Sequence, residues 1–372
     1  MKRKGPILVA MSGGVDSSVA AALLAKRGYE VIGLTMQIWQ ESQTDPRHAG
    51  CCSLGAVEDA RRVARQLGIP HYVMNFREEF RKAVIDDFID EYAAGRTPNP
   101  CVQCNKHVKF DILLQKAQEL GCPTLVTGHY ARIRQSEGRY RLLRARADDK
   151  DQSYVLFMLD EDQLARSWFP LGELPSKSMV RGLARDLGLH LADKPDSQEI
   201  CFVSEAGGYQ EFLAKAKPEM FSEGEIVDVA GKVLGHHSGV AGFTIGQRRG
   251  IGISSSEPMY VLELQPETNR VVVGSDEGLL RSKVHLEQMA WGSVTPEDGP
   301  TRVVAKIRYN MDPQPAILHG GDRPHLEFLS PVRAVTPGQI AVAYKGKSVA
   351  AGGVIQGGLP RNRKLQTLAM AR

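Results

Sequence analysis

The stretch SGGVDSS at residues 12–18 combines residue types that bind a phosphate group. It follows an apolar run at residues 7–11 and precedes a helical pattern that ends at Arg27. The first N–H groups of a helix lack intrahelical partners, and glycine lets a phosphate approach the backbone closely. The stretch lacks both the Gly-Lys-Ser/Thr ending of a P-loop and a GxGxxG spacing. The sequence therefore predicts an anion-binding loop of another kind.

Three cysteines lie in segments whose chemistry suits sulfur transfer. Cys101 and Cys104 form a CxxC pair, and Cys201 lies in the segment DSQEICF. Thiols at the start of a helix gain thiolate character from its dipole, and thiolates attack disulfides and persulfides. A CxxC pair also fits a redox pair or half of a zinc site, but no second pair follows at ligand spacing, which argues against structural zinc. Cys51, Cys52 and Cys122 have no partner spacing and are expected to be ordinary buried or loop residues.

Gly128 and His129 follow an apolar run at residues 124–127. Open α/β sheets bind ligands beyond the carboxyl ends of their strands. A lone histidine is more often structural than functional, but beside a phosphate loop we interpret His129 as a residue of the site.

The elements that position these residues alternate between short apolar runs and helical patterns, which is typical of a parallel sheet flanked by helices. Each predicted helix ends at a glycine, Gly28, Gly68 or Gly121, which can adopt the left-handed conformation without a steric cost. Two polar stretches, 40–50 and 96–105, are predicted to be loops. We predict strands at 7–11, 30–36, 71–75 and 124–127, and helices at 17–27, 54–67 and 110–120.

The pattern changes after Ser204. One short helix is expected within 205–220, and short β-branched runs separated by Pro and Gly then predict a small β-barrel or sandwich at the end of the chain. Strands are expected at 225–229, 259–264, 270–274, 302–308, 325–328, 339–344 and 348–354. The fold class is α/β, with three domains predicted at 1–204, 205–279 and 280–372.

Length and composition agree with this division. A chain of 372 residues, 42% apolar and 24% charged, can bury the cores of two or three domains. Six cysteines are too few for a disulfide scaffold, and we find neither a secretory signal nor an apolar run of about 18 residues. We expect a cytoplasmic protein with reduced thiols and no membrane association.

The loop at 12–18 resembles the signature of the PP-loop ATP-pyrophosphatases, which split ATP into AMP and pyrophosphate to adenylate a carbonyl-type oxygen. Six further stretches extend the resemblance over nearly the whole chain to the tRNA-specific 2-thiouridylases. They are TPNPCVQCNKHVKFD, VTGHYARI, DKDQSYVLF, KPDSQEICFV, FTIGQRRGIG and KIRYN. The resemblance implies an N-terminal domain like the adenine nucleotide alpha hydrolases, a small middle domain and a C-terminal β-barrel.

The family resemblance also implies an activity, ATP-dependent 2-thiolation of the wobble uridine in tRNA through an adenylated uridine, with AMP and pyrophosphate as products. It implies that ATP binds with Mg²⁺ near Asp16, and that a cysteine desulfurase or a sulfur-relay protein donates the sulfur. We expect a monomer. The implied ATP-binding residues are Ala10, Met11, Ser12, Gly13, Gly14, Val15, Asp16, Ser17, Ser18, Met36 and Gly128.

By the same resemblance Cys104 is the nucleophile and Cys201 carries the persulfide, so that a disulfide between them forms and must be reduced. Some family members have Asp where this chain has Cys101, which adds a third thiol. This departure admits an alternative in which Cys101, Cys104 and Cys201 ligate an iron–sulfur cluster. The implied tRNA contacts are Asn99, Pro100, Cys101, His129, Asp151, Gln152, Ser153, Arg308, Tyr309 and Gln339.

Two other functions remain open from the residues: a PP-loop amidotransferase or ligase, and a nucleic-acid-binding protein whose ATP loop is a regulatory switch. The net charge of +4 equals the charge of four bases near the end of the chain. Residues 132–150 hold seven bases against three acids, and residues 78–91 hold six acids. We interpret the basic segments as suited to a tRNA backbone, whose binding weakens with salt. The four terminal bases are Arg361, Arg363, Lys364 and Arg372.

Overall fold

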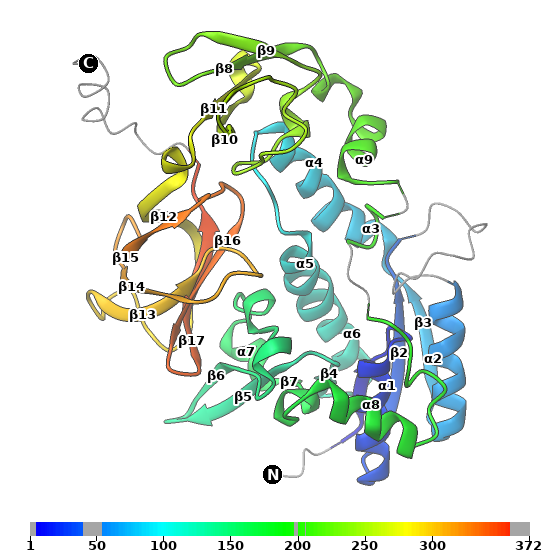
Figure 1. Ribbon diagram of the computed structural model, residues 1–372. Helices are drawn as coiled ribbons and strands as arrows, with labels where there is room; N and C mark the ends of the chain where they lie inside the picture. Colours follow the sequence, from blue (N-terminus) through cyan, green and yellow to red (C-terminus); the bar gives the residue numbers. More distant parts are fainter. Residues whose placement is uncertain (1–4, 40–53, 197–199, 205, 358–372) are drawn as a thin grey trace.

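The computed structural model describes residues 5–39, 54–196, 200–204 and 206–357 (Figure 1). The terminal bases Arg361, Arg363, Lys364 and Arg372 lie outside these residues, as do Cys51 and Cys52. Within the described residues, no helix is long and apolar enough to cross a membrane.

A five-stranded parallel sheet forms the centre of the N-terminal part, in the order β3-β2-β1-β4-β7. Successive side chains of a strand point to opposite faces. Ile7 and Val9 therefore pack into one apolar cluster and Leu8 into another on the opposite face. The four predicted strands of this region are confirmed to within two residues at their ends. The strands are β1 (Ile7–Ala10), β2 (Val31–Gln37), β3 (His71–Asn75), β4 (Thr124–Val126) and β7 (Ser167–Trp168).

Helices cover both faces of this sheet (Figure 1). On the face of Ile7 and Val9 lie α1 (Val15–Lys26), α2 (Leu54–Leu67) and α8 (Lys177–Asp186). The opposite face is covered by α3 (Arg77–Phe80), a π-helical segment (Arg81–Ile85), α4 (Asp86–Ala93), α5 (Pro100–Gln103), a second π-helical segment (Cys104–Ile112) and α6 (Leu113–Glu119).

The helix that carries Cys101 and Cys104 begins earlier than predicted. The stretch 96–105 was expected to be a loop and the helix to start at residue 110, but helical structure runs from Pro100 to Glu119. The side chain of Asn99 accepts the N–H of Val102 at 3.2 Å, and Pro100 occupies the first position, where no N–H is needed. The two prolines indicated a loop, but Pro100 is compatible with a helix start that Asn99 caps.

The C-terminal strands form a closed antiparallel barrel, because β12 pairs with β15 on one side and with β17 on the other. Four of the strands were predicted, whereas β12 and β14 were not. The barrel strands are β12 (Leu280–Trp291), β13 (Thr301–Lys306), β14 (Gln314–His319), β15 (His325–Arg333), β16 (Ile340–Lys345) and β17 (Ser348–Ile355).

A hairpin of β5 (Ala131–Ser136) and β6 (Arg139–Arg144) belongs to the N-terminal part of the chain but joins the barrel sheet. Leu143 of β6 pairs with Ser348 of β17. The short helix α7 (Glu161–Ala165) follows the hairpin.

The middle part has its own four-stranded sheet, in the order β10-β11-β8-β9, with a separate small apolar cluster. It contains α9 (Tyr209–Ala216), β8 (Gly224–Val227), β9 (Val233–His237), β10 (Tyr260–Gln265) and β11 (Arg270–Gly274).

The N-terminal helices and the barrel share one apolar cluster, in which Phe88 and Phe110 belong to the same core as Ile340 and Tyr344. The predicted fold class, a parallel-sheet domain, a small middle domain and a C-terminal β-barrel, is confirmed. The predicted boundaries at residues 204 and 279 stay predictions.

Candidate functional site

The loop after β1 and the loop after β4 open into one cavity of about 610 Å³. Strand β1 lies between β2 and β4, so the crossover from β1 to β2 and the crossover from β3 to β4 run in opposite directions along the sheet. Such a reversal of strand order leaves a crevice at the carboxyl ends of the two strands. Residues 10–17 line the cavity together with Met36, Gly128 and His129.

Hydrogen bonds within the loop fix its shape at the start of α1. The N–H of Ser12 donates to Oγ of Ser17 at 3.1 Å, and the Ser17 hydroxyl donates to the carbonyl of Gly14 at 3.2 Å. The Ser18 hydroxyl donates to the same carbonyl at 2.9 Å, and Ser18 is fully buried. Ser18 therefore stabilises the loop from its buried side, whereas residues 12–17 line the cavity.

Two glycines allow the close approach of neighbouring elements. A Cβ on Gly13, whose φ is +68°, would lie 2.0 Å from the carbonyl oxygen of Ala56 in α2. A Cβ on Gly128 would lie 2.8 Å from the backbone nitrogen of Ser17. Any side chain at either position would push the loop away from α2 or from the end of β4.

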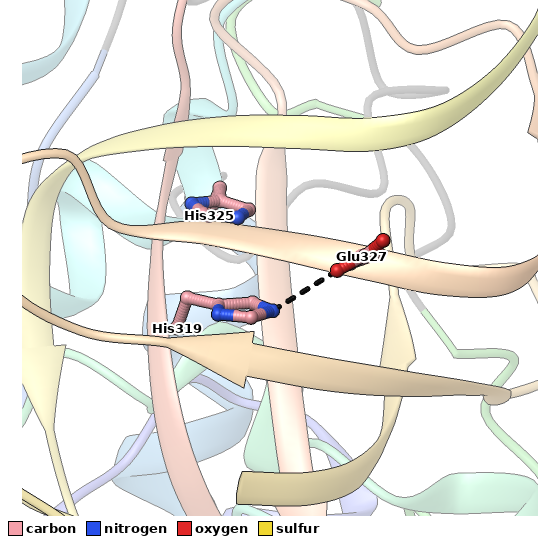
Figure 2. Close-up of side chains that lie close together, drawn as sticks. All are labelled: His319, His325 and Glu327. Carbon is pink, nitrogen blue, oxygen red and sulfur yellow. Dashed lines mark hydrogen bonds and ion pairs between the residues drawn. The ribbon is translucent and has the colours of Figure 1, made fainter. Parts of the chain in front are cut away.

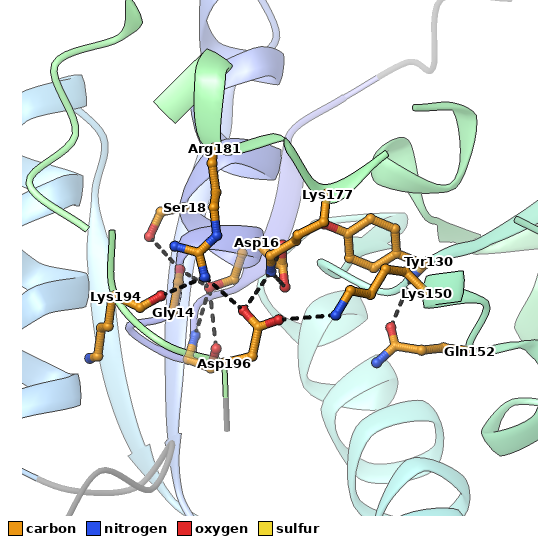
Figure 3. A network of polar contacts seen from close by, with 12 residues as sticks. Gly14, Asp16, Ser18, Tyr130, Lys150, Gln152, Lys177, Arg181, Lys194 and Asp196 are labelled. Atoms are coloured by element: carbon orange, nitrogen blue, oxygen red, sulfur yellow. Dashed lines mark hydrogen bonds and ion pairs between the residues drawn. The ribbon is translucent and has the colours of Figure 1, made fainter. Parts of the chain in front are cut away.

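Asp16 belongs to an ion-pair network on the wall of the cavity (Figure 3). Nζ of Lys177 lies 2.8 and 2.7 Å from the two carboxylate oxygens of Asp16, and the Tyr130 hydroxyl donates to Asp16 at 2.7 Å. Lys177 also lies 2.8 Å from Asp196, which Arg181 and Lys150 contact at 3.4 and 3.5 Å. Burial tends to raise the pKa of Asp196, but Lys177 and the two other cations hold it below its ordinary value.

Lys194 connects the same loop to α2. Its Nζ donates to the carbonyl of Gly13 at 2.9 Å and to Asp59 at 2.8 Å, and His190 contacts the other oxygen of Asp59 at 2.9 Å. Lys177 and Lys194 thus place two ammonium groups at the cavity beside the N-terminus of α1. Neither lysine was predicted as a site residue. Lys194 is the first residue of the stretch KPDSQEICFV, which carries part of the family resemblance, so the sequence could have indicated it as a site residue. Lys177 lies in no such stretch.

His129 is held in its neutral form. Its Nδ1 lies 2.7 Å from Oγ1 of Thr127, and its ring packs against the rings of Phe110 and Phe169. Burial, with a smaller contribution from the charge of Lys109, lowers its pKa well below the ordinary value. His129 can therefore offer one donor and one acceptor at neutral pH.

The three thiols differ in exposure. Cys101 is exposed, Cys104 is 9% exposed within the cluster shared with the barrel, and Cys201 packs against that cluster. Among the described residues, the cavity lining includes Met36 and His129 but none of these thiols.

Two residues connect the thiols to the cavity. Lys109 lines the cavity and donates to Oδ1 of Asn105, the neighbour of Cys104, at 3.0 Å. Tyr309 also lines the cavity, and its pKa is raised by burial and then by the charges of Asp151 and Cys101, which places its phenol near the Cys101 thiol.

Several residues expected to contact tRNA also hold the protein together. Asp151 accepts the N–H of Ala145 at 2.9 Å and the hydroxyl of buried Ser153 at 2.8 Å. Gln339 donates to the carbonyls of Thr97 and Pro98 at 3.1 and 3.3 Å. Gln152 accepts the N–H of Tyr130 and lines the cavity, Arg308 donates to the carbonyl of Arg333, and Pro100 is buried beside the capping residue Asn99.

The basic segment 132–150 is compensated by carboxylates in the folded protein. Six of its seven bases contact an acid, and Arg132 donates to the carbonyl of Arg144. Glu161, Glu173 and Asp196, which supply part of this charge, lie outside the segment. The segment is therefore less basic as a surface than its composition indicated. The pairs are Arg134–Glu173, Arg139–Glu161, Arg141–Glu137, Arg144–Asp151, Arg146–Glu173 and Lys150–Asp196.

Three family descriptions match consecutive parts of the chain. Residues 5–205 match "tRNA methyl transferase HUP domain", residues 210–275 match "tRNA methyl transferase PRC-barrel domain", and residues 281–355 match "Aminomethyltransferase beta-barrel domain".

The chain is similar over almost its whole length to proteins named "tRNA-specific 2-thiouridylase MnmA". One from Clostridioides difficile is 46% identical over 354 residues, which cover 94% of this chain and 98% of that protein. One from Carboxydothermus hydrogenoformans is 49% identical over 366 residues, covering 94% and 97%. A solved 4-thiouridine synthetase–RNA complex with bound ATP is only 21% identical, with a TM-score of 0.34 over 53% of this chain and 45% of that one.

Proposed function

Because the chain belongs to the family of tRNA-specific 2-thiouridylases, which are tRNA sulfurtransferases, we propose that it replaces O2 of the wobble uridine in tRNA by sulfur, using ATP. The observation that carries the proposal is the convergence of the loop at residues 12–17, the N-terminus of α1 and two lysines, Lys177 and Lys194, on one cavity. Backbone N–H groups and ammonium groups together suit the pyrophosphate portion of ATP.

In the first step, uridine O2 attacks the α-phosphorus of ATP. A bond forms between O2 and phosphorus, and the bond from phosphorus to the bridging oxygen breaks, so that pyrophosphate leaves. Lys177 and Lys194 lie where they can neutralise the charge on the leaving group, and the close packing of Gly13 and Gly128 keeps the loop N–H groups in position.

Asp16 suits a magnesium ion, because carboxylate oxygens are the ligands that this cation prefers. When bound, the ion would offset phosphate charge. Both oxygens of Asp16 are engaged by Lys177 in the structure, so Lys177 must move toward the phosphates for Asp16 to hold the ion.

In the second step, sulfur arrives as a persulfide on Cys201 from a sulfur-donor protein. Cys104 attacks the Cys201 sulfur, so that a Cys104–Cys201 disulfide forms and hydrosulfide leaves. The hydrosulfide attacks C2 of the adenylated uridine, and AMP departs with the former O2. In an alternative route, the terminal sulfur of the Cys201 persulfide itself attacks C2 and displaces AMP. Cys104 then attacks the Cys201 sulfur and breaks the bond between it and the transferred sulfur. In both routes a dithiol reductant restores the thiols. The partly apolar surroundings of Cys104 and Cys201 support this assignment because they limit the access of water to the sulfur.

The iron–sulfur alternative uses the same three thiols as ligands of a cluster that carries sulfide. The exposure of Cys101 favours the persulfide route, because a buried cluster would need all three thiols in one enclosed site. Anaerobic purification with quantitation of iron separates the two: thiolation activity in iron-free protein rules out the cluster.

Mass spectrometry of anticodon nucleosides, after incubation with tRNA, ATP and a persulfide donor, tests the proposal. We expect 2-thiouridine with the wild-type protein and none with Cys201→Ser or Cys104→Ser, while pyrophosphate release continues in both variants. Cys122→Ala is the matched control, since Cys122 is buried at the end of α6 and should retain both activities. Thiolation by Cys201→Ser at the wild-type rate would show that the persulfide assignment is wrong.

A further inference from the structure

Three side chains that the proposed reaction does not use lie on one outer face of the barrel (Figure 2). His319 ends β14 and pairs directly with His325, which begins β15. Glu327 follows His325 by two residues, so it points to the same face and lies diagonal to His319. Leu318 and Leu326, which alternate with them, are buried in the barrel core. The alternation therefore leaves two imidazoles and a carboxylate together on the outside.

The contacts of the three side chains leave their ligand atoms close together. One nitrogen of each histidine and one oxygen of Glu327 lie within 4.8 Å of one another. Nε2 of His319 lies 3.1 Å from Oε2 of Glu327, and the two imidazole rings are stacked, with centroids 4.3 Å apart. A tetrahedral zinc ion with bonds of about 2.1 Å separates its ligand atoms by about 3.4 Å, so small side-chain rotations would suffice.

The tautomer of His325 suits a ligand. Its Nδ1 lies 3.0 Å from the carbonyl of Arg323, so this nitrogen carries the proton and Nε2 keeps its lone pair. Metal-binding histidines commonly donate their second ring N–H to a backbone carbonyl in this way. The ring of His285, on β12, lies 5.4 Å from that of His325.

From this geometry we propose that His319, His325 and Glu327 bind a borderline divalent cation, of which zinc is the best match to two imidazoles and one carboxylate. His285 does not belong to the group of ligand atoms within 4.8 Å of one another, so water would complete the coordination. Arg323 and Lys283 lie close to the histidines and oppose the positive charge of the ion, so we expect moderate affinity. The ion would tie β14 to β15, and none of the three ligands lines the nucleotide cavity. The site is thus independent of thiolation.

Zinc titration of tag-free, chelator-treated full-length protein by isothermal calorimetry tests the site. Because the cysteines also bind zinc, the number of zinc equivalents bound by the wild type is compared with that of the variants. The wild-type protein should bind one equivalent more than His319→Ala or His325→Ala. Glu327→Gln should weaken the affinity for that equivalent at least tenfold. His236→Ala, which removes an exposed histidine on β9, is the matched control and should bind as the wild type does.

X-ray absorption at the zinc edge gives a second measurement that needs no variant. With the cysteines alkylated and one equivalent of zinc added, we expect nitrogen and oxygen neighbours, with the multiple scattering of two imidazoles. Equal stoichiometry for the wild type and both histidine variants would overturn the proposal, and so would a spectrum without imidazole scattering.

Discussion

Lys177 is the residue on which the charge balance of the nucleotide cavity depends. Its side chain is 11% exposed, and its ammonium group bridges Asp16 and Asp196 at distances of 2.7 to 2.8 Å. The same group is available to phosphate oxygens only if it leaves Asp16. Such an exchange lets one side chain stabilise both the empty and the occupied cavity.

The change Lys177→Met should therefore have two effects. We expect the free energy of unfolding to fall by about 1–3 kcal/mol, because two partly buried carboxylates lose a charged partner. We also expect kcat/KM for ATP to fall at least tenfold, about 1.4 kcal/mol. Urea unfolding and the rate of pyrophosphate release measure the two. Lys150→Met is the control, because Lys150 contacts Asp196 at 3.5 Å from a side chain that is 36% exposed, and it should cost less than about 1 kcal/mol.

His129 should make stability depend on pH. Its folded-state pKa lies well below the ordinary value of 6.5, so the unfolded chain binds a proton that the folded protein does not as the pH falls through that value. The free energy of unfolding should therefore decrease as the pH falls below about 6.5, with this residue contributing up to about 1.4 kcal/mol per pH unit.

Urea unfolding between about pH 7.5 and 5.5 measures this slope. His129→Gln should reduce this slope by up to about 1.4 kcal/mol per pH unit, the contribution of one proton. The change His236→Gln, at an exposed position, should leave the slope nearly unchanged. An unaltered slope in His129→Gln would mean that the imidazole is protonated in the folded protein.

At the scale of elements, the phosphate loop depends on how closely α2 approaches it. Gly13 and Gly28 have similar φ values, +68° and +77°, but a Cβ would lie 2.0 Å from the Ala56 carbonyl at Gly13 and would meet nothing within 4 Å at Gly28. Alanine at Gly28 should cost only the left-handed conformation, about 1 kcal/mol. Alanine at Gly13 should cost more and should abolish binding of a non-hydrolysable ATP analogue. Urea unfolding and calorimetric titration test both, and equal costs would contradict the argument.

Two elements differ from the prediction for a similar reason. Strand β6 (Arg139–Arg144) mixes bases with apolar residues, and its bases indicated a nucleic-acid surface rather than a strand. The start of the thiol-bearing helix was interpreted as a loop because of its prolines, although Asn99 caps it. In β6 the bases, and at the helix start the prolines, masked a local strand or helix pattern.

At the scale of the whole molecule, the N-terminal part and the barrel are joined by buried contacts. Arg96, which is 19% exposed, contacts Glu91 at 2.8 Å and Glu287 of β12 at 2.7 Å, and Gln339 contacts the neighbouring Thr97. Because of these contacts and the shared apolar cluster, we expect that neither part is stable by itself.

Arg96→Met should lower the free energy of unfolding by about 3 kcal/mol, because two partly buried carboxylates lose their partner at the interface. The loss should be seen by probes in both parts, such as hydrogen exchange in β1 and in β16. Arg61→Met is the control, since its pair with Glu58 is exposed and should contribute less than about 1 kcal/mol. Destabilisation confined to the barrel would contradict the coupling.

Features that depend on residues adjacent in the chain could be predicted from the amino-acid sequence. The anion-binding loop follows from two glycines between a strand and a helix, and the parallel sheet follows from apolar runs that alternate with helices ending at Gly28 and Gly68. The CxxC spacing of Cys101 and Cys104 predicted reactive thiols, whereas the start of the helix that carries them was found only in the structure.

Only the tertiary structure decided which distant charges meet. It brings Lys177 and Asp196 to Asp16, and it places Glu161 and Glu173 against bases that composition had suggested were open to RNA. The antiparallel pairing of β14 with β15 likewise brings His319 to Glu327. The physical reason is that ion pairs and ligand clusters depend on strand order and on the packing of helices, which bring together residues that local sequence patterns treat as unrelated.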